Sequence, residues 1–422
     1  MTDRGGDDPI RVLAISQLFP PESMGGAHRW HKLARHLPDG FECHVIAPPP
    51  IVPLGTFERS NRPWRRETVD GVSVTRLWTY QPAGDDDWAG VGRILNYLVF
   101  ALLASLYVVV NWRRYDCVVT FVGPHSTLVP GIVAKALGRA WIVDVDDLWI
   151  DNAVDLGFIE RDSAVHRAVE ALERRAFALA DHVVVLTPTM AEQYAAKHDA
   201  PDDDFTPVPY GIDLDEFATT TATADGTDPL DDRPVVYTGK FGQAQAFEPF
   251  FRGFARLDGD RELLVVGFGD RRDELERLAR DLGIEDRVSF EGPVPREEIP
   301  SILRSAALSW VPLKTEHSLD YARPTKLLET MAVGTPYVAS RVTEIEVVTE
   351  RSGAGVAVDN DPAAIADAMR DVLADDAARA EMGRRGAAFV SEHHRWETLG
   401  ARVGDVIADA TGGRSRRATT AP

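Results

Sequence analysis

Two residue types are scarce in this sequence of 422 residues, and the first of them is cysteine. Cys43 and Cys117 both lie in apolar stretches typical of strands, and their spacing matches neither a zinc site nor a disulfide framework. Buried thiols of this kind are typical of a reducing compartment. The start of the chain, MTDRGGDDP, is polar and lacks the apolar core of a signal peptide. We therefore expect a cytoplasmic protein.

Lysine is the second scarce residue, with 6 lysines against 40 arginines. The 41 aspartates and 25 glutamates together outnumber the lysines and arginines, so the formal net charge is −20. This charge argues against a nucleic-acid partner, because a nucleic-acid-binding protein needs a basic face to displace counterions from the phosphates, and we exclude that partner. Acidic residues throughout the chain with so little lysine indicate adaptation to salt, which predicts a halophilic host, a haloarchaeon. A hydrophobic content of 44% excludes a disordered chain.

One long run, residues 94–112, carries no charge. A run of about 20 apolar residues is long enough to cross a bilayer. This one lies between two strand-like segments, 72–78 and 116–122, which a spanning helix would place on opposite sides of the membrane. We therefore predict a buried crossover helix between two strands of one sheet. A helix lying in the membrane surface is the alternative.

Short β-branched runs alternate with helical segments in both halves of the chain, which predicts an α/β protein with mostly parallel sheets. A stretch rich in Thr, Asp and Ala at 219–233 lacks apolar periodicity and is typical of a linker. The predicted segments are an N-terminal half at 9–215, a linker at 216–233, a C-terminal half at 234–394, a helix at 395–410 and a disordered tail at 411–422. Two such halves place a ligand in the cleft between them, at the carboxyl ends of the strands.

Residues 324–329 (PTKLLE) stand at the start of an apparent helix, whose free N–H groups and partial positive charge suit a diphosphate. Lys326 adds a full charge, Arg323 lies nearby, and Leu328 belongs to the same motif. Glu329 suits a different contact, because a carboxylate accepts paired hydrogen bonds from vicinal hydroxyls such as those of ribose. The alternative interpretation is a capped surface helix with a solvated lysine and glutamate.

Three glycine-bearing loops follow predicted strands: Gly25-Gly26, 239–242 (GKFG) and 267–269 (GFG). Glycine lets the backbone approach a ligand closely. Arg272 occupies the third glycine position after residue 267, so that loop is not a dinucleotide fingerprint. Together with the charged helix start, the loops predict a phosphate-binding cleft, with Gly25, Gly26 and Gly242 among the donor-binding residues.

In this order and spacing, the motifs resemble those of a family 4 glycosyltransferase of the two-domain GT-B type, in the branch that builds surface polysaccharides and lipid-linked sugars. The resemblance runs from about Ile10 to Trp396, and further motifs that carry it are PPE at 20–22, DLW at 147–149, ADHVVV at 180–185, PYGID at 209–213 and GTP at 334–336. It implies two Rossmann-like domains that face each other across a cleft, with a C-terminal helix that crosses back to the first. It also implies transfer from a nucleotide-diphosphate-sugar with retained anomeric configuration, without a metal or another cofactor.

The resemblance assigns Gly26 to the donor diphosphate. Lys240 falls where the family has a basic residue, usually arginine, on the same group. The family's companion lysine is Gln245 here, and we expect Lys326 to restore the lost charge. Glu329 matches the second acid of the family's paired-glutamate motif, the one that holds the ribose hydroxyls.

Two catalytic candidates lie in the first half, each just past a predicted strand. His125 would contact the donor sugar or the acceptor, and the alternative is a histidine that caps a helix or faces solvent. Asp147 would orient or deprotonate the acceptor hydroxyl, and the neighbouring Asp146 is expected to raise its pKa. The spacing of Asp144 and Asp146 also matches the metal-binding carboxylates of the other major glycosyltransferase fold, although the two-half pattern favours the metal-free type.

The motifs indicate the transferred sugar, the nucleotide and the acceptor less specifically than they indicate the fold. Tyr321 stands where the family has the first acid of the paired motif, so the transferred sugar stays open. UDP is the expected nucleotide, with GDP second, and the expected acceptor is a lipid-linked sugar or a glycan, with residues 94–112 as a peripheral contact with the cytoplasmic membrane face. A sugar-nucleotide epimerase of the same fold and a catalytically degenerate scaffold are the alternatives, and the departures at Gln245 and Tyr321 keep the scaffold open.

Overall fold

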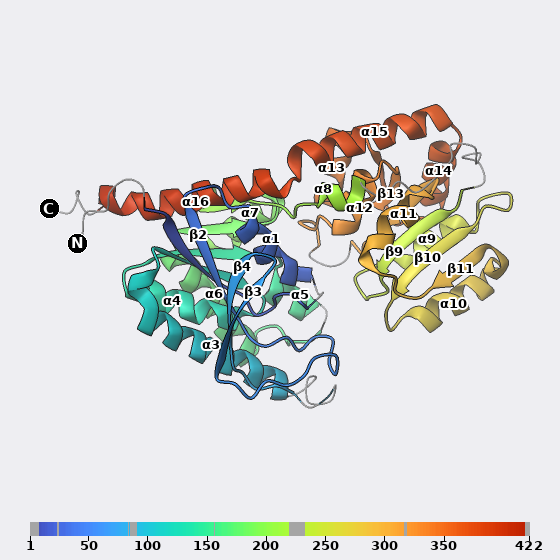
Figure 1. Cartoon of the computed structure of the whole chain (residues 1–422). Coiled ribbons are helices and arrows are strands. Elements are labelled where there is room, and N and C mark those ends of the chain that lie inside the picture. Colours follow the sequence, from blue (N-terminus) through green and yellow to red (C-terminus); the bar gives the residue numbers. More distant parts are fainter. Residues whose placement is uncertain are drawn as a thin grey trace. The chain divides into compact units, whose positions relative to one another are not determined.

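The structure is a computed structural model that describes residues 8–22, 25–82, 84, 91–155, 157–218, 233–315 and 319–417. The chain forms two compact units, whose elements are labelled in Figure 1. The first unit comprises Met1–Pro209 and Trp396–Pro422, and the second comprises Tyr210–Arg395. Each unit holds one mostly parallel sheet, as the alternation of strand and helix patterns predicts.

The described strands of the first unit are β1 (Ile10–Ile15), β2 (Phe41–Ala47), β3 (Trp64–Val69), β4 (Val72–Leu77), β5 (Cys117–Val122), β6 (Ala140–Val145), β7 (His182–Val185) and β8 (Phe205–Pro207). They form one sheet in the order β3-β4-β2-β1-β5-β6-β7-β8. Only the β3–β4 pair among them is antiparallel. The strand order reverses between β1 and β5, and sheets of this kind bind ligands at the carboxyl ends of such strands.

The described α-helices of the first unit are α1 (Arg29–Arg35), α3 (Val91–Asn111), α4 (Leu128–Ala136), α5 (Trp149–Asp155), α6 (Ala164–Leu179), α7 (Pro188–His198) and α16 (Trp396–Arg417).

A buried ion pair attaches α1 to the sheet. Arg29 donates from Nε and Nη2 to Asp144 of β6, at 2.8 and 2.9 Å, and Trp30 Nε1 donates to the same carboxylate at 2.7 Å. The guanidinium also donates to the carbonyls of Val208 and Pro209, so it fixes the start of α1 against β6 and the segment after β8.

The described strands of the second unit are β9 (Val235–Lys240), β10 (Leu263–Phe268), β11 (Val288–Glu291), β12 (Leu308–Val311), β13 (Tyr337–Ser340) and β14 (Gly355–Val358). All pair in parallel in the order β11-β10-β9-β12-β13-β14. This is the strand order of a Rossmann sheet, whose ligand-binding reversal falls between β9 and β12. The fold class predicted from the sequence is therefore confirmed.

The described α-helices of the second unit are α8 (Leu214–Ala218), α9 (Phe247–Phe254), α10 (Arg272–Asp281), α11 (Ile299–Arg304), α12 (Thr325–Ala332), α13 (Thr343–Ser352), α14 (Pro362–Leu373) and α15 (Asp376–His393). An aromatic cluster fixes α9 against the sheet. Phe250, Phe251 and Phe254 meet Trp310 of β12 edge to face, with ring centroids 5.5 to 5.9 Å apart. Such contacts add to the apolar area that the helix buries.

The division between the units differs from the predicted boundary at residue 215. It falls after Pro209, because α8 packs with the second unit and buries Phe217 beside Leu327 and Met331. Of the predicted linker, 216–218 are the end of α8, 233 is described, and 219–232 lie outside the described residues.

The C-terminal helix crosses back to the first unit, as predicted. After α15 of the second unit, α16 packs against α1, β5 and β6 (Figure 1). It extends to Arg417 rather than 410, so 411–417 of the predicted tail are helical, and 418–422 lie outside the described residues. Gly400 allows the close approach to α1, because a Cβ there would collide with the carbonyl oxygen of His36.

The uncharged run forms α3, and it corrects the expectation of a buried helix. The crossover between β4 and β5 is present, and Phe100, Ala104 and Val108 are buried against the sheet. The opposite face of the helix is exposed along its whole length, with Leu102 at 67%. By length and composition, this helix is long and apolar enough to cross a membrane, and the described residues contain one such helix.

The contact between α16 and α1 predicts an unusual response to alanine. Gly→Ala in a helix normally stabilises by up to about 1 kcal/mol. We expect Gly400→Ala to lower the free energy of unfolding instead, by about 1–3 kcal/mol, because backbone must move to admit the methyl group. Gly412→Ala in the same helix has no neighbour within 4 Å and should not lower it. Urea unfolding followed by tryptophan fluorescence compares the two, and equal stabilities would contradict the close approach.

Candidate functional site

Lys326 lies at the start of α12 and reaches the carboxyl end of β9. Its Nζ donates a 2.8 Å hydrogen bond to the Tyr237 hydroxyl and lies 4.4 Å from the centroid of that ring. Gly239, at a φ of 134°, leaves room for the amine, since a Cβ there would lie 3.2 Å from Nζ. Because β9 borders the reversal of strand order, the lysine lies where Rossmann-like sheets bind their ligands.

The environment of Lys326 changes its protonation. Burial of the amino group lowers the pKa of Lys326 to about 8, and the charge of Glu329 opposes this shift only in part. The charged form is therefore poorly solvated, and an anion beside it would replace the missing solvation. Tyr237, which the sequence did not single out, accepts one of its three protons as a hydrogen bond.

The glycines at the carboxyl ends of β9 and β10 serve the packing of the protein itself. A Cβ at Gly267 would collide with the carbonyl oxygen of Gly239, and one at Gly269 with that of Phe241. Phe241 N also donates to the carbonyl of Phe268 at 2.7 Å. The close approach of β9 and β10 therefore requires glycine at both positions, whether or not the loop at 267–269 also meets a ligand.

The loop after β9 holds the other predicted donor-binding residues of this region. Lys240 ends the strand and is exposed. Gly242 N donates to Gln245 Oε1 at 3.0 Å, so Gln245 fixes the loop and adds no charge. A cavity of about 360 Å³ adjoins this loop and is lined in part by Arg271 and Lys314.

Glu329 is buried on α12, and a partner from another element orients it. Its Oε1 accepts a 3.2 Å hydrogen bond from Arg296 Nη1, and the same guanidinium pairs with Glu216 at 3.1 Å. Arg296 could not be predicted from the sequence, because it lies in a charged stretch that matches no motif. Lys326 and Glu329 are one helical turn apart, which places both on neighbouring positions of the helix surface.

The side chains of Arg323 and Leu328 have partners within the second unit. Arg323 Nη2 donates to Glu344 Oε2 at 2.6 Å, and Glu344 is buried, so the unit neutralises this charge internally. Leu328 packs fully in the core beside α13 and has only its backbone to offer a ligand. Tyr321, at the position of the family's first acid, is also buried.

The predicted glycine pair of the first unit opens the 3-10 helix η1 (Gly25–His28). The backbone at Gly26 lies close to the carboxyl ends of β5 and β6. A Cβ there would press on the ring of Phe121 and lie 3.0 Å from Asp146 Oδ2. The absence of a side chain at Gly26 therefore lets η1 approach the loop that carries Asp147.

Asp147 follows β6 and is half-buried. Burial raises its pKa to about 7, and the charge of Asp146 adds to the effect. A hydrogen bond from Asn152 Nδ2 acts in the opposite direction. The raised pKa agrees with the expectation, although burial contributes more than the neighbouring carboxylate, and it suits a group that exchanges a proton near neutral pH.

His125 lies in the 3-10 helix η3 (His125–Thr127) and belongs to a buried ionic network. Its Nε2 lies 2.8 Å from Glu173 Oε2, and the other oxygen of Glu173 accepts from Lys197 at 2.8 Å and from His198 at 3.1 Å. Burial alone would raise the pKa of Glu173, but the bonds from the two histidines and the charge of Lys197 lower it. The network orients the imidazole of His125 at the end of β5. Glu173, Lys197 and His198 were missed, because no spacing links α6 and α7 to that strand.

Asp144 does not fit the metal-binding interpretation. Both of its oxygens accept hydrogen bonds from Arg29, one of them also from Trp30, and its side chain is fully buried. Asp146 points elsewhere, since its Oδ1 accepts from Trp149 Nε1 at 3.2 Å. The two carboxylates therefore have separate structural partners.

Two family models match the chain, one in each half. The model described as "Glycosyl transferase 4-like domain" matches residues 24–211, and "Glycosyl transferases group 1" matches residues 232–375. The two matches cover most of the chain.

Curated relatives are similar in sequence to this chain. It is 29% identical over 453 aligned residues to "D-inositol 3-phosphate glycosyltransferase 1" of Catenulispora acidiphila. That alignment covers 99% of this chain and 100% of the relative. It is 31% identical over 260 residues to "D-inositol 3-phosphate glycosyltransferase" of Xylanimonas cellulosilytica, where the match spans 58% of this chain and 61% of the relative's length. A third relative, "GDP-mannose-dependent alpha-(1-6)-phosphatidylinositol monomannoside mannosyltransferase" of Mycolicibacterium smegmatis, is 31% identical and matches over 48% of this chain and 55% of its own length.

Solved structures share the fold at lower identity. The sucrose-phosphate synthase of Thermosynechococcus elongatus superposes with a TM-score of 0.71 at 19% identity and covers 96% of this chain and 100% of its own. Anabaena HepE in complex with UDP superposes with a TM-score of 0.67 at 15% sequence identity, and the match covers 95% of this chain and 100% of HepE. The two family matches indicate a two-domain glycosyltransferase. The two Rossmann-like units and the return of α16 to the first unit are the architecture expected of one. The chain therefore belongs to the group 1 and 4-like glycosyltransferases and has the GT-B fold.

Proposed function

We propose that this glycosyltransferase moves a sugar from a nucleotide-diphosphate-sugar to a hydroxyl of a lipid-linked or glycan acceptor, with retention at the anomeric carbon and without a metal. The observation that carries the proposal is the pair of charged groups on the first turns of α12. Lys326 presents a poorly solvated amine at the carboxyl end of β9, and Glu329 presents an oriented carboxylate one turn later. The first suits a diphosphate and the second suits the hydroxyls of a ribose.

The proposed step breaks the bond between the anomeric carbon and the diphosphate oxygen, and the acceptor oxygen bonds to the same face of that carbon. Negative charge grows on the departing diphosphate, and Lys326, Lys240 and the N-terminus of α12 supply positive charge to stabilise it. The acceptor hydroxyl loses its proton during the step. Asp147, with its pKa near 7, is the group of the first unit that we assign to orient that hydroxyl or to take the proton.

UDP is the preferred nucleotide and GDP the second candidate. The fold neighbour HepE is described in complex with UDP and with UDP-glucose, which supports the first, and the mycobacterial relative named as GDP-mannose-dependent supports the second. The relatives named for inositol 3-phosphate add a polyol phosphate as a further acceptor class. The free thiols of Cys43 and Cys117 support action in the cytoplasm.

Nucleotide binding is the direct test of the donor site. We expect one of UDP, GDP and ADP to raise the unfolding temperature of the full chain in molar KCl, which the acidic composition favours. A ligand at 100 times its dissociation constant stabilises by about 2.7 kcal/mol. Glu329→Ala should remove the shift, whereas Glu350→Ala, an exposed glutamate on α13, should keep it. If no nucleotide raises the unfolding temperature of the folded wild-type protein, the proposal fails and the results favour the scaffold alternative.

Two substitutions separate charge from loop structure at the diphosphate. Lys326→Ala should weaken nucleotide binding at least tenfold, because it removes the amine at the end of β9. Gln245→Ala should change the affinity less than threefold, because Gln245 only holds Gly242 N. Since the unliganded amine has a pKa of about 8 and binds as the cation, wild-type affinity should fall about tenfold from pH 7 to pH 9. Calorimetry at both pH values measures this, and an equally steep fall in Lys326→Ala would assign it to another group.

The role of Asp147 has a pH signature. If its carboxylate takes the proton, the rate of nucleoside-diphosphate release should fall as the pH drops below about 7. Asp147→Asn should lower that rate about 10²–10⁴-fold. Asp146→Asn removes a neighbouring negative charge, so it should lower the pKa of Asp147 and move the acid limb to lower pH. An acid limb that stays in place in Asp146→Asn would leave Asp147 without this role.

A further inference from the structure

The outer face of α3 is an apolar surface without cover from the described residues. Its exposed side chains recur at helical spacing and are Val91, Ile94, Leu95, Leu98, Leu102, Leu106, Val109 and Val110. Soluble surfaces seldom present so many large aliphatic side chains in one stripe, and such stripes mark contacts with a partner or a membrane. The inner face of the same helix already packs on the sheet through Phe100, Ala104 and Val108.

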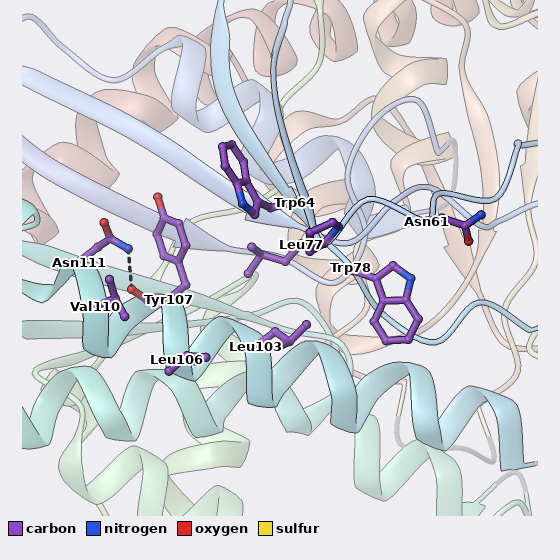
Figure 2. Close-up of a pocket in the computed structure, with 10 residues that line it drawn as sticks. Asn61, Trp64, Leu77, Trp78, Leu103, Leu106, Tyr107, Val110 and Asn111 are labelled. Atoms are coloured by element: carbon purple, nitrogen blue, oxygen red, sulfur yellow. Dashed lines mark hydrogen bonds between the residues drawn. The ribbon is translucent and has the colours of Figure 1, made fainter.

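A groove continues this surface onto the neighbouring hairpin of β3 and β4. Figure 2 shows Leu103, Leu106 and Tyr107 of α3 along one wall and Trp64, Leu77 and Trp78 along the other. The cavity has a volume of about 450 Å³, and its remaining lining residues are Asn61, Pro63, Val110 and Asn111. Trp64 is 58% exposed at its rim. A lining so poor in polar groups suits a hydrocarbon chain better than a sugar or a nucleotide.

The charges around the surface are basic in a strongly acidic protein. Residues 88–115 contain no aspartate or glutamate but include Arg93, Arg113 and Arg114. On the hairpin, the guanidinium of Arg66 lies over Trp64, 5.7 Å from the ring centroid. None of these four arginines forms an ion pair with another described residue. A protein with a net charge of −20 thus presents exposed arginines beside the aliphatic stripe of α3.

Aromatic side chains complete the pattern at the C-terminal end of the helix. The guanidiniums of Arg113 and Arg139 lie 4.9 and 5.0 Å from the ring centroid of Trp112. Tyr107 and Tyr115 share a hydrogen bond of 3.1 Å between their hydroxyls. Tryptophan, tyrosine and arginine around an aliphatic stripe are the residues enriched at the boundary between lipid chains and headgroups.

We propose that the outer face of α3 lies in the surface of an anionic lipid bilayer, with a hydrocarbon chain of a lipid in the groove against the β3–β4 hairpin. Arg66, Arg93, Arg113 and Arg114 contact the headgroup phosphates, and the aliphatic stripe enters the region of the chains. The helix lies along the surface, because its inner face stays bound to the sheet. A second copy of this chain is a poor occupant, since it would bring two sets of the same arginines together.

This inference goes beyond the proposed transfer reaction and does not depend on it. It concerns where the first unit binds, whereas the donor site belongs to the second unit. An enzyme held at a bilayer by this surface would meet acceptors that are confined to the membrane, which is the acceptor class that the helix face favours.

Vesicle flotation of the full chain tests the proposal. The protein should float with vesicles of phosphatidylcholine and phosphatidylglycerol and much less with phosphatidylcholine alone. Leu98→Glu combined with Leu102→Glu should abolish flotation, because it places two charges in the aliphatic stripe. Val165→Glu, at a 59% exposed valine on α6 outside the surface, should float like the wild type. Arg113→Gln with Arg114→Gln should reduce the partition coefficient about fivefold per arginine in low salt.

Two readouts keep the outcomes distinct. The nucleotide-induced rise in unfolding temperature should be the same in the Leu98→Glu, Leu102→Glu variant as in the wild type, which shows a folded protein with its donor site intact. Flotation that is equal in all variants, or absent with both vesicles, overturns the proposal. A dimer in sedimentation equilibrium that the same double substitution dissociates also overturns it, because the surface then binds a second copy.

Discussion

The first unit is organised around the buried ion pair between Arg29 and Asp144. One guanidinium joins the start of α1, the carboxyl end of β6 and the carbonyls of Val208 and Pro209, which are the last residues before the chain enters the second unit. Removal of one partner from such a pair leaves an uncompensated charge and typically costs about 3–5 kcal/mol. The same contacts fix the two loops that carry the candidate groups, since Gly26 precedes Arg29 and Asp147 follows Asp144. Asp144 is thereby a structural residue, and Asp147, three residues later, is the carboxylate that we propose as the reactive one.

The second unit positions its cation by close backbone packing instead of by an ion pair. Gly239 and Gly267 let the ends of β9 and β10 approach each other, and the space at Gly239 admits the amine of Lys326. Burial lowers the pKa of Lys326 to about 8, and the charge of Glu329 one turn away opposes this shift only in part. A bound diphosphate would supply the missing charge. Gln245 adds no charge to this region, because its side chain holds the backbone N–H of Gly242.

The sequence predicted the features that depend on local pattern. Alternating strands and helices and the charged start of α12 follow from periodicity and from motifs within a few residues, whereas the return of α16 to the first unit was implied by the family resemblance. It did not predict the partners that orient the site: Glu173 for His125, Arg296 for Glu329 and Glu344 for Arg323. Each of these pairs joins elements far apart along the chain, and a charged residue on an amphipathic helix has the same pattern whether it faces solvent or a buried partner. Glycine was ambiguous for the same reason, since a residue without a side chain admits a ligand or a neighbouring strand equally well.

The helix α3 shows why hydropathy alone could not decide its surroundings. An uncharged run predicts removal from water, but protein core and lipid satisfy that requirement equally. The connections decide, because β4 before the helix and β5 after it belong to the same sheet. Asn96 strengthens the attachment: its side chain accepts from Gln17 Nε2 at 2.8 Å and donates to the carbonyl of Tyr80 at 2.7 Å, and both contacts are inside the unit. A helix anchored in this way has one face for the sheet and one for another apolar phase. The fold therefore keeps a segment that is long enough to span a bilayer attached to the sheet along one face and leaves its other face apolar and exposed.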